Sequence, residues 1–164
     1  MKPKTTKVVK EPAVNNQTAE TQADDTQEPL NPDAGYTFLI EKGIASKLSP
    51  KSAGAVFFQL AVKDEDSSLH LRISGNEGGG LHSKEWVSVT AIIDALTPLK
   101  DQNFKSNVFK KVMVGKSSNN VSFLSGILRS ADIGLIEPSP EGTFLHKLPA
   151  DFELKCKTLL ALAG

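Results

Sequence analysis

The sequence of 164 residues contains a single cysteine, Cys156, and no long hydrophobic run. One cysteine rules out a disulfide bond within the chain. No apolar stretch approaches the roughly 20 residues that a membrane-spanning helix requires, and no apolar segment follows the N-terminal lysines as it would in a signal peptide. We therefore expect a soluble cytoplasmic protein that does not associate with a membrane.

Motifs for metal and nucleotide binding are lacking as well. The possible metal ligands lie far apart, without C-x-x-C or H-x-x-x-H spacing. They are His70, His82, His146 and Cys156. The tripeptide Gly-Lys-Ser at residues 115–117 is typical of the end of a P-loop, but Lys110 stands where that motif requires its first glycine. We expect no metal, no cofactor and no enzymatic activity.

Residues 1–35 are poor in apolar side chains and contain four lysines against six acidic residues. Such a segment buries too little apolar surface to offset the conformational entropy that folding removes. We predict a disordered tail over residues 1–35. A single domain follows over residues 36–164, which contain all eight Phe, the Trp and the only Tyr.

Alternating apolar and polar residues predict strands in the first part of this domain, residues 36–87. Residues 55–63 and 69–74 both alternate, and a polar turn separates them. Residues 81–87 are a candidate third strand, whereas residues 36–40 fit either a strand or the start of a helix. The sequence thus predicts a small antiparallel β-meander.

Apolar spacings of three and four residues predict helices in the second part, residues 88–164. Caps and breakers set their limits: Ser88 begins the first helix, and Gly115 follows the second. A Pro/Gly-rich turn between two apolar runs predicts a hairpin. The predicted helices cover residues 88–96, 104–113, 117–131 and 149–163, and the hairpin covers residues 134–147.

Basic residues dominate residues 102–131, which contain no Asp or Glu, although the whole chain balances 19 basic against 19 acidic residues. The basic residues are Lys105, Lys110, Lys111, Lys116 and Arg129. Clustered lysines are typical of surfaces that bind a phosphate backbone. They are equally typical of the solvated face of an ordinary amphipathic helix.

The order helix, helix, helix, hairpin over residues 88–147 resembles the winged helix-turn-helix superfamily. Residues 120–129 match a recognition helix, residues 132–136 lead out of it, and residues 137–146 match the wing. With the preceding meander, this indicates an α+β protein whose second half is winged-helix-like. The resemblance implies a DNA-binding protein, such as a transcription regulator or an accessory factor for DNA transactions.

The third predicted helix presents small polar residues and one guanidinium, which suit a DNA major groove. Its N-terminus offers amides to phosphate, and the lysines would contact backbone phosphates. The predicted nucleic-acid-binding residues are Lys105, Lys110, Lys111, Lys116, Asn119, Asn120, Ser122, Ser125 and Arg129.

Two acidic residues, Glu137 and Glu141, fall on the predicted wing, where their charge would repel phosphate. An acidic wing favours a protein partner. A protein–protein interaction module that uses the same fold is therefore the alternative to a DNA-binding protein.

Overall fold

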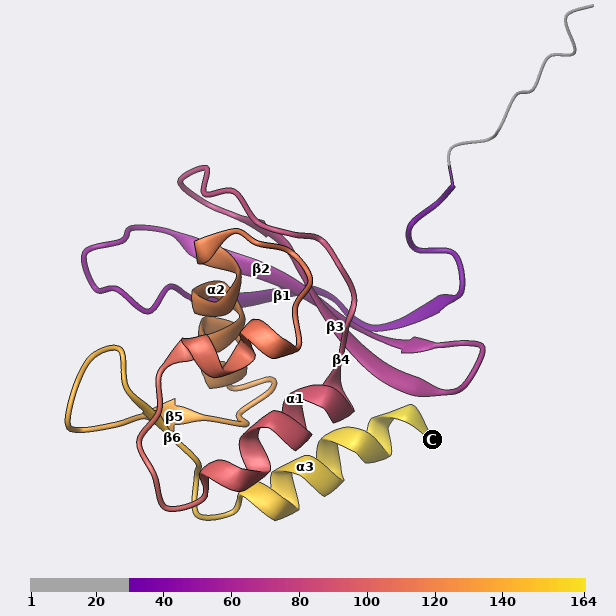
Figure 1. The fold of residues 1–164 in the computed structure, drawn as a ribbon. Coiled ribbons are helices and arrows are strands. Elements are labelled where there is room, and N and C mark those ends of the chain that lie inside the picture. The colour runs from indigo at the N-terminus through magenta and orange to yellow at the C-terminus, as the bar shows by residue number, and fades with distance from the viewer. Residues whose placement is uncertain (1–29) are drawn as a thin grey trace, which may run out of the picture. The chain divides into compact units, whose positions relative to one another are not determined.

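The computed structural model describes residues 30–164, and Figure 1 shows their fold. Residues 1–29 of the predicted tail lie outside the described part of the chain. A compact unit extends from Asp33 to Gly164. It contains a four-stranded antiparallel sheet followed by helices, which confirms the predicted α+β class.

The main sheet contains β1 (Tyr36–Ser46), β2 (Ala55–Lys63), β3 (Ser68–Asn76) and β4 (Val87–Ser88), in that order. Leu60 of β2 lies opposite Leu71 of β3, so the alternating apolar residues of both strands share one face. The predicted β2–β3 hairpin is confirmed, and residues 36–40 belong to a strand. The apolar residues on the shared face are buried: Val56, Phe58, Leu60, Leu69, Leu71 and Ile73.

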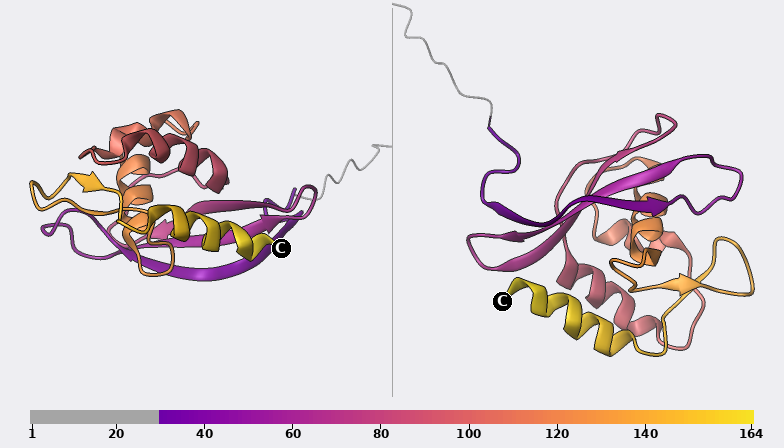
Figure 2. Two further views of the ribbon diagram at one scale, coloured as in Figure 1. Left: turned by 90° about the horizontal axis from the view of Figure 1, so that it is seen from below. Right: turned by 180° about the vertical axis from the view of Figure 1, so that it is seen from behind.

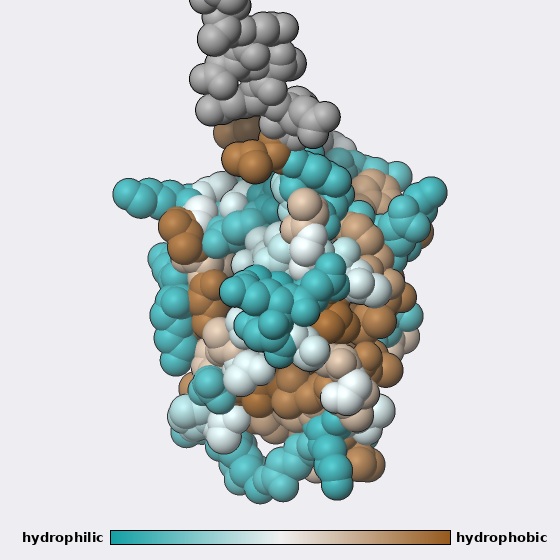
Figure 3. All heavy atoms as spheres, turned by 90° about the vertical axis from the view of Figure 1, so that its right-hand side faces the viewer, coloured by the Kyte–Doolittle hydropathy of each residue, from teal (hydrophilic) through white to brown (hydrophobic). Residues whose placement is uncertain are grey.

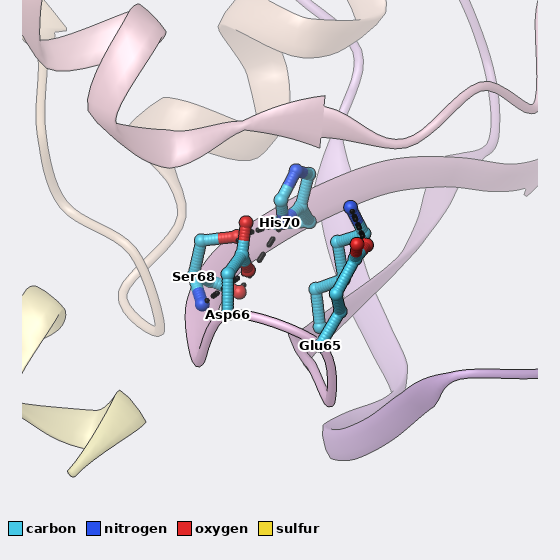
Figure 4. A network of polar contacts seen from close by, with 5 residues as sticks. Glu65, Asp66, Ser68 and His70 are labelled. Atoms are coloured by element: carbon cyan, nitrogen blue, oxygen red, sulfur yellow. Dashed lines mark hydrogen bonds and ion pairs between the residues drawn. The ribbon is translucent and has the colours of Figure 1, made fainter.

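Side-chain hydrogen bonds fix the turn between β2 and β3 (Figure 4). The Asp66 carboxylate accepts hydrogen bonds from Ser68 N at 3.0 Å and from Ser68 Oγ at 2.5 Å. Lys63 forms an ion pair with Glu65 at 2.7 Å. Figure 3 views the molecule from the right-hand side of Figure 1, where this turn lies, and shows apolar patches separated by polar residues.

The helices lie on one side of the sheet, as the left view of Figure 2 shows. They are α1 (Val89–Leu96), α2 (Ser118–Arg129) and α3 (Phe152–Leu160), with the short 3-10 helices η1 (Thr97–Leu99), η2 (Ser106–Lys111) and η3 (Ala161–Ala163). The predicted hairpin is present as β5 (Glu137–Pro138) and β6 (His146–Lys147). On α3, Cys156 is buried in the core, and burial raises the pKa of its thiol.

The helix predicted over residues 104–113 is wrong, because the chain there forms only η2. Phe104 is held in a β-bridge to His146 instead: Phe104 N donates to His146 O at 2.9 Å, and His146 N donates to Phe104 O at 2.8 Å. The bridge keeps Phe104 outside any helix. Phe109, within η2, still fills the core as the apolar pattern required.

An aromatic cluster covers part of the sheet face opposite the helices. Tyr36 and Trp86 stack with their ring centroids 4.4 Å apart, and the Arg72 guanidinium lies 4.4 Å from the Trp86 ring centroid. Arg72 Nε donates to Gln59 Oε1 at 2.7 Å, and its Nη2 forms an ion pair with Asp33 at 2.5 Å. These contacts satisfy the charge of Arg72, which is only 8% exposed.

The helix α2 lies against the end of β1. A Cβ added to Gly126 would be 2.5 Å from the carbonyl oxygen of Ser46, closer than such atoms approach in real proteins. All residues from 123 to 128 are buried. The missing side chain of Gly126 therefore allows α2 to occupy the centre of the domain.

We expect Gly126→Ala to destabilise the protein. In most helix interiors this substitution stabilises by about 1 kcal/mol, but here the added methyl group meets a backbone oxygen and overpacks the core, which costs roughly 1–3 kcal/mol. Urea denaturation should show a net loss of up to about 2 kcal/mol. Ser118→Ala on the exposed first turn is the control, and an increase in stability for Gly126→Ala would contradict the packing described.

Candidate nucleic-acid interface

The start of α2 is fastened to the segment that leads from β3 to β4. Ser117 caps the helix by accepting a hydrogen bond from Asn119 N at 3.4 Å. Ser117 Oγ and Asn119 Nδ2 both donate to the carbonyl oxygen of Leu81, at 2.7 and 3.1 Å. The segment and the helix start consequently form one continuous surface, at an end of the helix that favours anions.

Asn120 also joins the start of α2 to this segment, and it is buried, with an exposed fraction of 1%. Its Oδ1 accepts a hydrogen bond from Ser83 N at 2.8 Å. Residues 81–83 are hydrogen-bonded to the start of α2 and do not pair with β3. The strand predicted over residues 81–87 is therefore reduced to β4. The prediction that Asn120 contacts nucleic acid is wrong, because its side chain is enclosed.

A groove of about 470 Å³ opens beside the first turns of α2. It is lined by the β1–β2 loop, the glycine-rich loop after β3, the start of η2, α2 itself and the β5–β6 loop. Among the described residues, no Asp or Glu lines this groove. Its polar and aromatic side chains are those of Lys47, Ser49, Ser52, Lys105, Ser106, Asn107, Asn119, Ser122, Phe123 and Phe144.

Lys47 brings a positive charge to the wall of the groove. Its ammonium lies 5.6 Å from the centroid of the Phe123 ring and donates a hydrogen bond to the carbonyl oxygen of Glu77. The Glu77 carboxylate itself accepts a hydrogen bond from Ala55 N at 2.7 Å. Within residues 30–164, no ion pair neutralises Lys47.

A second hollow, of about 560 Å³, is lined by Lys110, Lys116 and the start of α2. The half-buried Glu85 shapes its loop by accepting hydrogen bonds from Val114 N at 2.8 Å and Gly115 N at 2.7 Å. Burial alone would raise the pKa of Glu85, but these N–H groups and Ser83 stabilise the carboxylate, so its pKa lies below the ordinary value. The Glu85 charge is thus directed at the loop backbone.

Phe144 lies on the β5–β6 loop at the rim of the groove and is 55% exposed. The loop is closed by backbone hydrogen bonds from Ser139 N to Leu145 O at 2.9 Å and from Leu145 N to Gly142 O at 3.0 Å. A large exposed ring on a hydrogen-bonded loop is a candidate surface for stacking.

Arg129 anchors the same loop to α2. Its Nη2 donates to the carbonyl oxygens of Leu145 at 2.9 Å and Thr143 at 3.4 Å, and its Nε donates to His146 Nδ1 at 3.0 Å. Desolvation lowers the pKa of the Arg129 guanidinium. The prediction that Arg129 projects from an exposed helix face is therefore wrong, because the side chain is engaged with the hairpin.

His146 is fully buried and places its Nε2 2.9 Å from Ser106 Oγ, a distance that would suit a catalytic Ser–His pair. However, the Arg129 Nε–H can only donate, so His146 Nδ1 must carry the lone pair and the proton of the neutral ring must lie on Nε2. A general base for Ser106 would need its lone pair on Nε2. This arrangement holds the hairpin in place and does not activate the serine.

Five of the nine predicted binding residues line the two hollows. Lys105, Asn119 and Ser122 lie in the groove, and Lys110 and Lys116 lie in the second hollow. Lys111 is exposed but lines neither.

Ser125 is fully buried, with its Oγ 2.8 Å from both Ser106 Oγ and the carbonyl oxygen of Val121, so its predicted exposure is wrong. Ser125 and Gly126 of α2 are buried and permit close packing, so they do not belong to an exposed face of the helix.

Sequence reasoning missed most of the polar and aromatic residues of the groove, namely Lys47, Ser49, Ser52, Ser106, Asn107, Phe123 and Phe144. Lys47 and Phe144 are distant from α2 in the sequence, so no local periodicity could connect them with it. The only available signal was a phenylalanine, Phe144, close to a turn rich in Pro and Gly, where apolar residues are unusual.

Residues 30–164 contain no group of three His, Cys, Asp or Glu residues placed to hold a metal ion. No helix in this part of the chain has the length and apolar character needed to cross a bilayer. Comparisons with models of protein families, with curated proteins and with solved structures found no match to the chain.

The burial of His146 predicts a pH-dependent stability. Desolvation, reinforced by the Arg129 charge, lowers the His146 pKa from 6.5 to about 4. Between these values the unfolded chain binds more protons than the folded one, so stability falls as the pH falls. We expect a loss of ~3 kcal/mol from this group between pH 7 and pH 4.

Urea denaturation at pH 7, 5.5 and 4 measures this loss, with His146→Gln as the variant that lacks the titrating group. The variant should lose less stability than the wild type over the same range. Titration of the His146 imidazole itself near pH 6.5 in the folded wild type, followed by NMR, would contradict the expectation.

Proposed function

We propose that this protein binds DNA without catalysing a reaction, and that the groove beside α2 contacts the nucleic acid. The observation that carries this proposal is the composition of the groove: two lysines that form no ion pair within residues 30–164, several amide and hydroxyl groups, an exposed Phe and no carboxylate. Lysines near phosphates release counterions from DNA, which supplies affinity without sequence selection.

The second hollow extends the same surface past the start of α2. Lys110 and Lys116 lie there, so positive charge flanks the helix N-terminus on both sides. A nucleic-acid strand that crosses the first turn of α2 would meet lysines before and after the crossing. A role as a transcription regulator or an accessory factor in DNA transactions is part of this proposal.

The acidic residues of the predicted wing weigh little against it. Glu137 forms an ion pair with Lys147 at 3.0 Å, which compensates its charge, and only Glu141 remains exposed without such a pair in the described residues. Repulsion of phosphate is therefore confined to one carboxylate on the β5–β6 loop.

A protein-interaction module is the second candidate, favoured by three large apolar side chains exposed around the same helix start. They are Leu81, Val114 and Phe144. A protein that binds there through apolar contacts would form a complex that persists at high salt, whereas a DNA complex would dissociate.

We expect the double variant Lys105→Gln/Lys116→Gln to weaken DNA binding. Removal of two phosphate contacts should reduce the slope of log K against log salt by about 1.4–1.8, and affinity at 0.1 M salt should fall on the order of 10- to 50-fold. Fluorescence anisotropy with a labelled oligonucleotide over a salt series measures both quantities.

The matched control is Lys42→Gln/Lys157→Gln, which removes the same net charge from exposed lysines that line neither hollow. This control should bind nearly as the wild type does. Equal losses in the two double variants would indicate a general charge effect, and the absence of any binding at low salt would reject the proposal.

A further inference from the structure

We propose that the groove takes single-stranded DNA, with a base stacked on Phe144 and the adjoining phosphates held by Lys47 and Lys105. This inference rests on the proposed function and specifies its substrate class. In this inference, Phe144 is the residue that makes the groove prefer a single strand over a duplex.

The position of α2 disfavours duplex recognition. A helix that reads the major groove must present a face of several side chains to the bases. Here residues 123–128 are buried, and the exposed part of α2 is limited to its first turns. Those turns line a concave groove between loops, which suits a separated strand. Within the described residues, α2 does not protrude as a helix that reads the major groove would.

Phe144 is held ready for stacking. Arg129 anchors its loop by donating hydrogen bonds to the carbonyl oxygens of the residues on either side of it, Thr143 and Leu145. The ring is 55% exposed although its neighbour His146 is fully buried. Because the backbone is fixed before binding, little conformational entropy remains to be lost when a base stacks on the ring.

The polar side chains of the groove suit the edges of unpaired bases. Asn119 Nδ2 is occupied by Leu81 O, but its Oδ1 forms no hydrogen bond within residues 30–164 and can accept one. Asn107 is exposed and offers both a donor and an acceptor. Watson–Crick edges are free to meet such groups only when the base is not paired.

Gly80 keeps one wall of the groove open. A Cβ at this position would lie 3.1 Å from Asn119 Nδ2 and 3.1 Å from the Phe123 ring. The absence of a side chain lets the glycine-rich loop pass close to both residues while the space in front of them stays available.

The first experiment compares probes on the full-length protein. Labelled oligothymidine of about 12 nucleotides, an abasic strand of the same length and a duplex of the same length are titrated at equal salt. We expect the oligothymidine to bind tightest. The abasic strand keeps the phosphates but lacks bases, so it should bind roughly 5- to 150-fold more weakly, as expected for one lost stacking contact. Tighter binding of oligouridine of the same length than of oligothymidine would overturn the assignment to DNA.

The second experiment changes the ring. Phe144→Ala should weaken oligothymidine binding roughly 5- to 150-fold without changing the salt slope, since no phosphate contact is lost. Phe144→Leu should behave like Phe144→Ala, because it keeps apolar bulk without a planar ring, whereas Phe144→Trp should retain affinity. Leu154→Ala, an exposed apolar position on α3 outside the groove, is the matched control and should have no effect.

Fluorescence supplies an independent readout. The indole introduced by Phe144→Trp should be quenched by oligothymidine and not by the abasic strand. The wild type reports the background, since its only tryptophan, Trp86, stacks on Tyr36 on the opposite face of the sheet.

Tighter binding of the duplex, equal binding of the abasic strand, or unchanged affinity in Phe144→Ala would overturn this inference while leaving DNA binding by the groove in place. No binding of any of the probes at low salt would instead reject the proposed function itself.

Discussion

The close approach of α2 to the end of β1 decides which surfaces this domain can offer. Gly126 lets the helix backbone reach the carbonyl oxygen of Ser46, so the second half of α2 is enclosed. Only the first turns of the helix remain accessible. The loops around those turns then become the walls of a groove, and the basic residues before α2 are distributed on either side of its N-terminus.

The hairpin depends on the same helix. Arg129, at the end of α2, holds the β5–β6 loop, and the neutral ring of His146 joins that loop to η2. Arg129, which the sequence places on a DNA-reading face, thus has a structural role. Its hydrogen bonds position the rim of the groove, because Phe144 lies between the two carbonyl groups that Arg129 binds.

Local pattern predicted much of the fold. The alternation in β2 and β3, the cap at Ser88 and the hairpin over residues 134–147 all depend on neighbours in the sequence, and the structure contains them. The prediction failed where distant residues decide. Phe104 takes its conformation from His146, and Ser125 is buried because η2 and β1 cover α2 on faces that a single apolar stripe does not reveal. The groove is made by five separate segments, so its residues could be found from sequence only in part.

The buried thiol of Cys156 allows the motion of one element to be timed. Cys156 lies on α3 with an exposed fraction of 8%, at the wall of a small hollow, and its pKa is raised, so a thiol reagent should react with it slowly until the helix moves outward. A change in the labelling rate at neutral pH therefore reports a change in how closely α3 packs on the core. Since Cys156 does not line the groove, comparison of that rate with and without an oligonucleotide would show whether occupation of the groove tightens the opposite end of the domain.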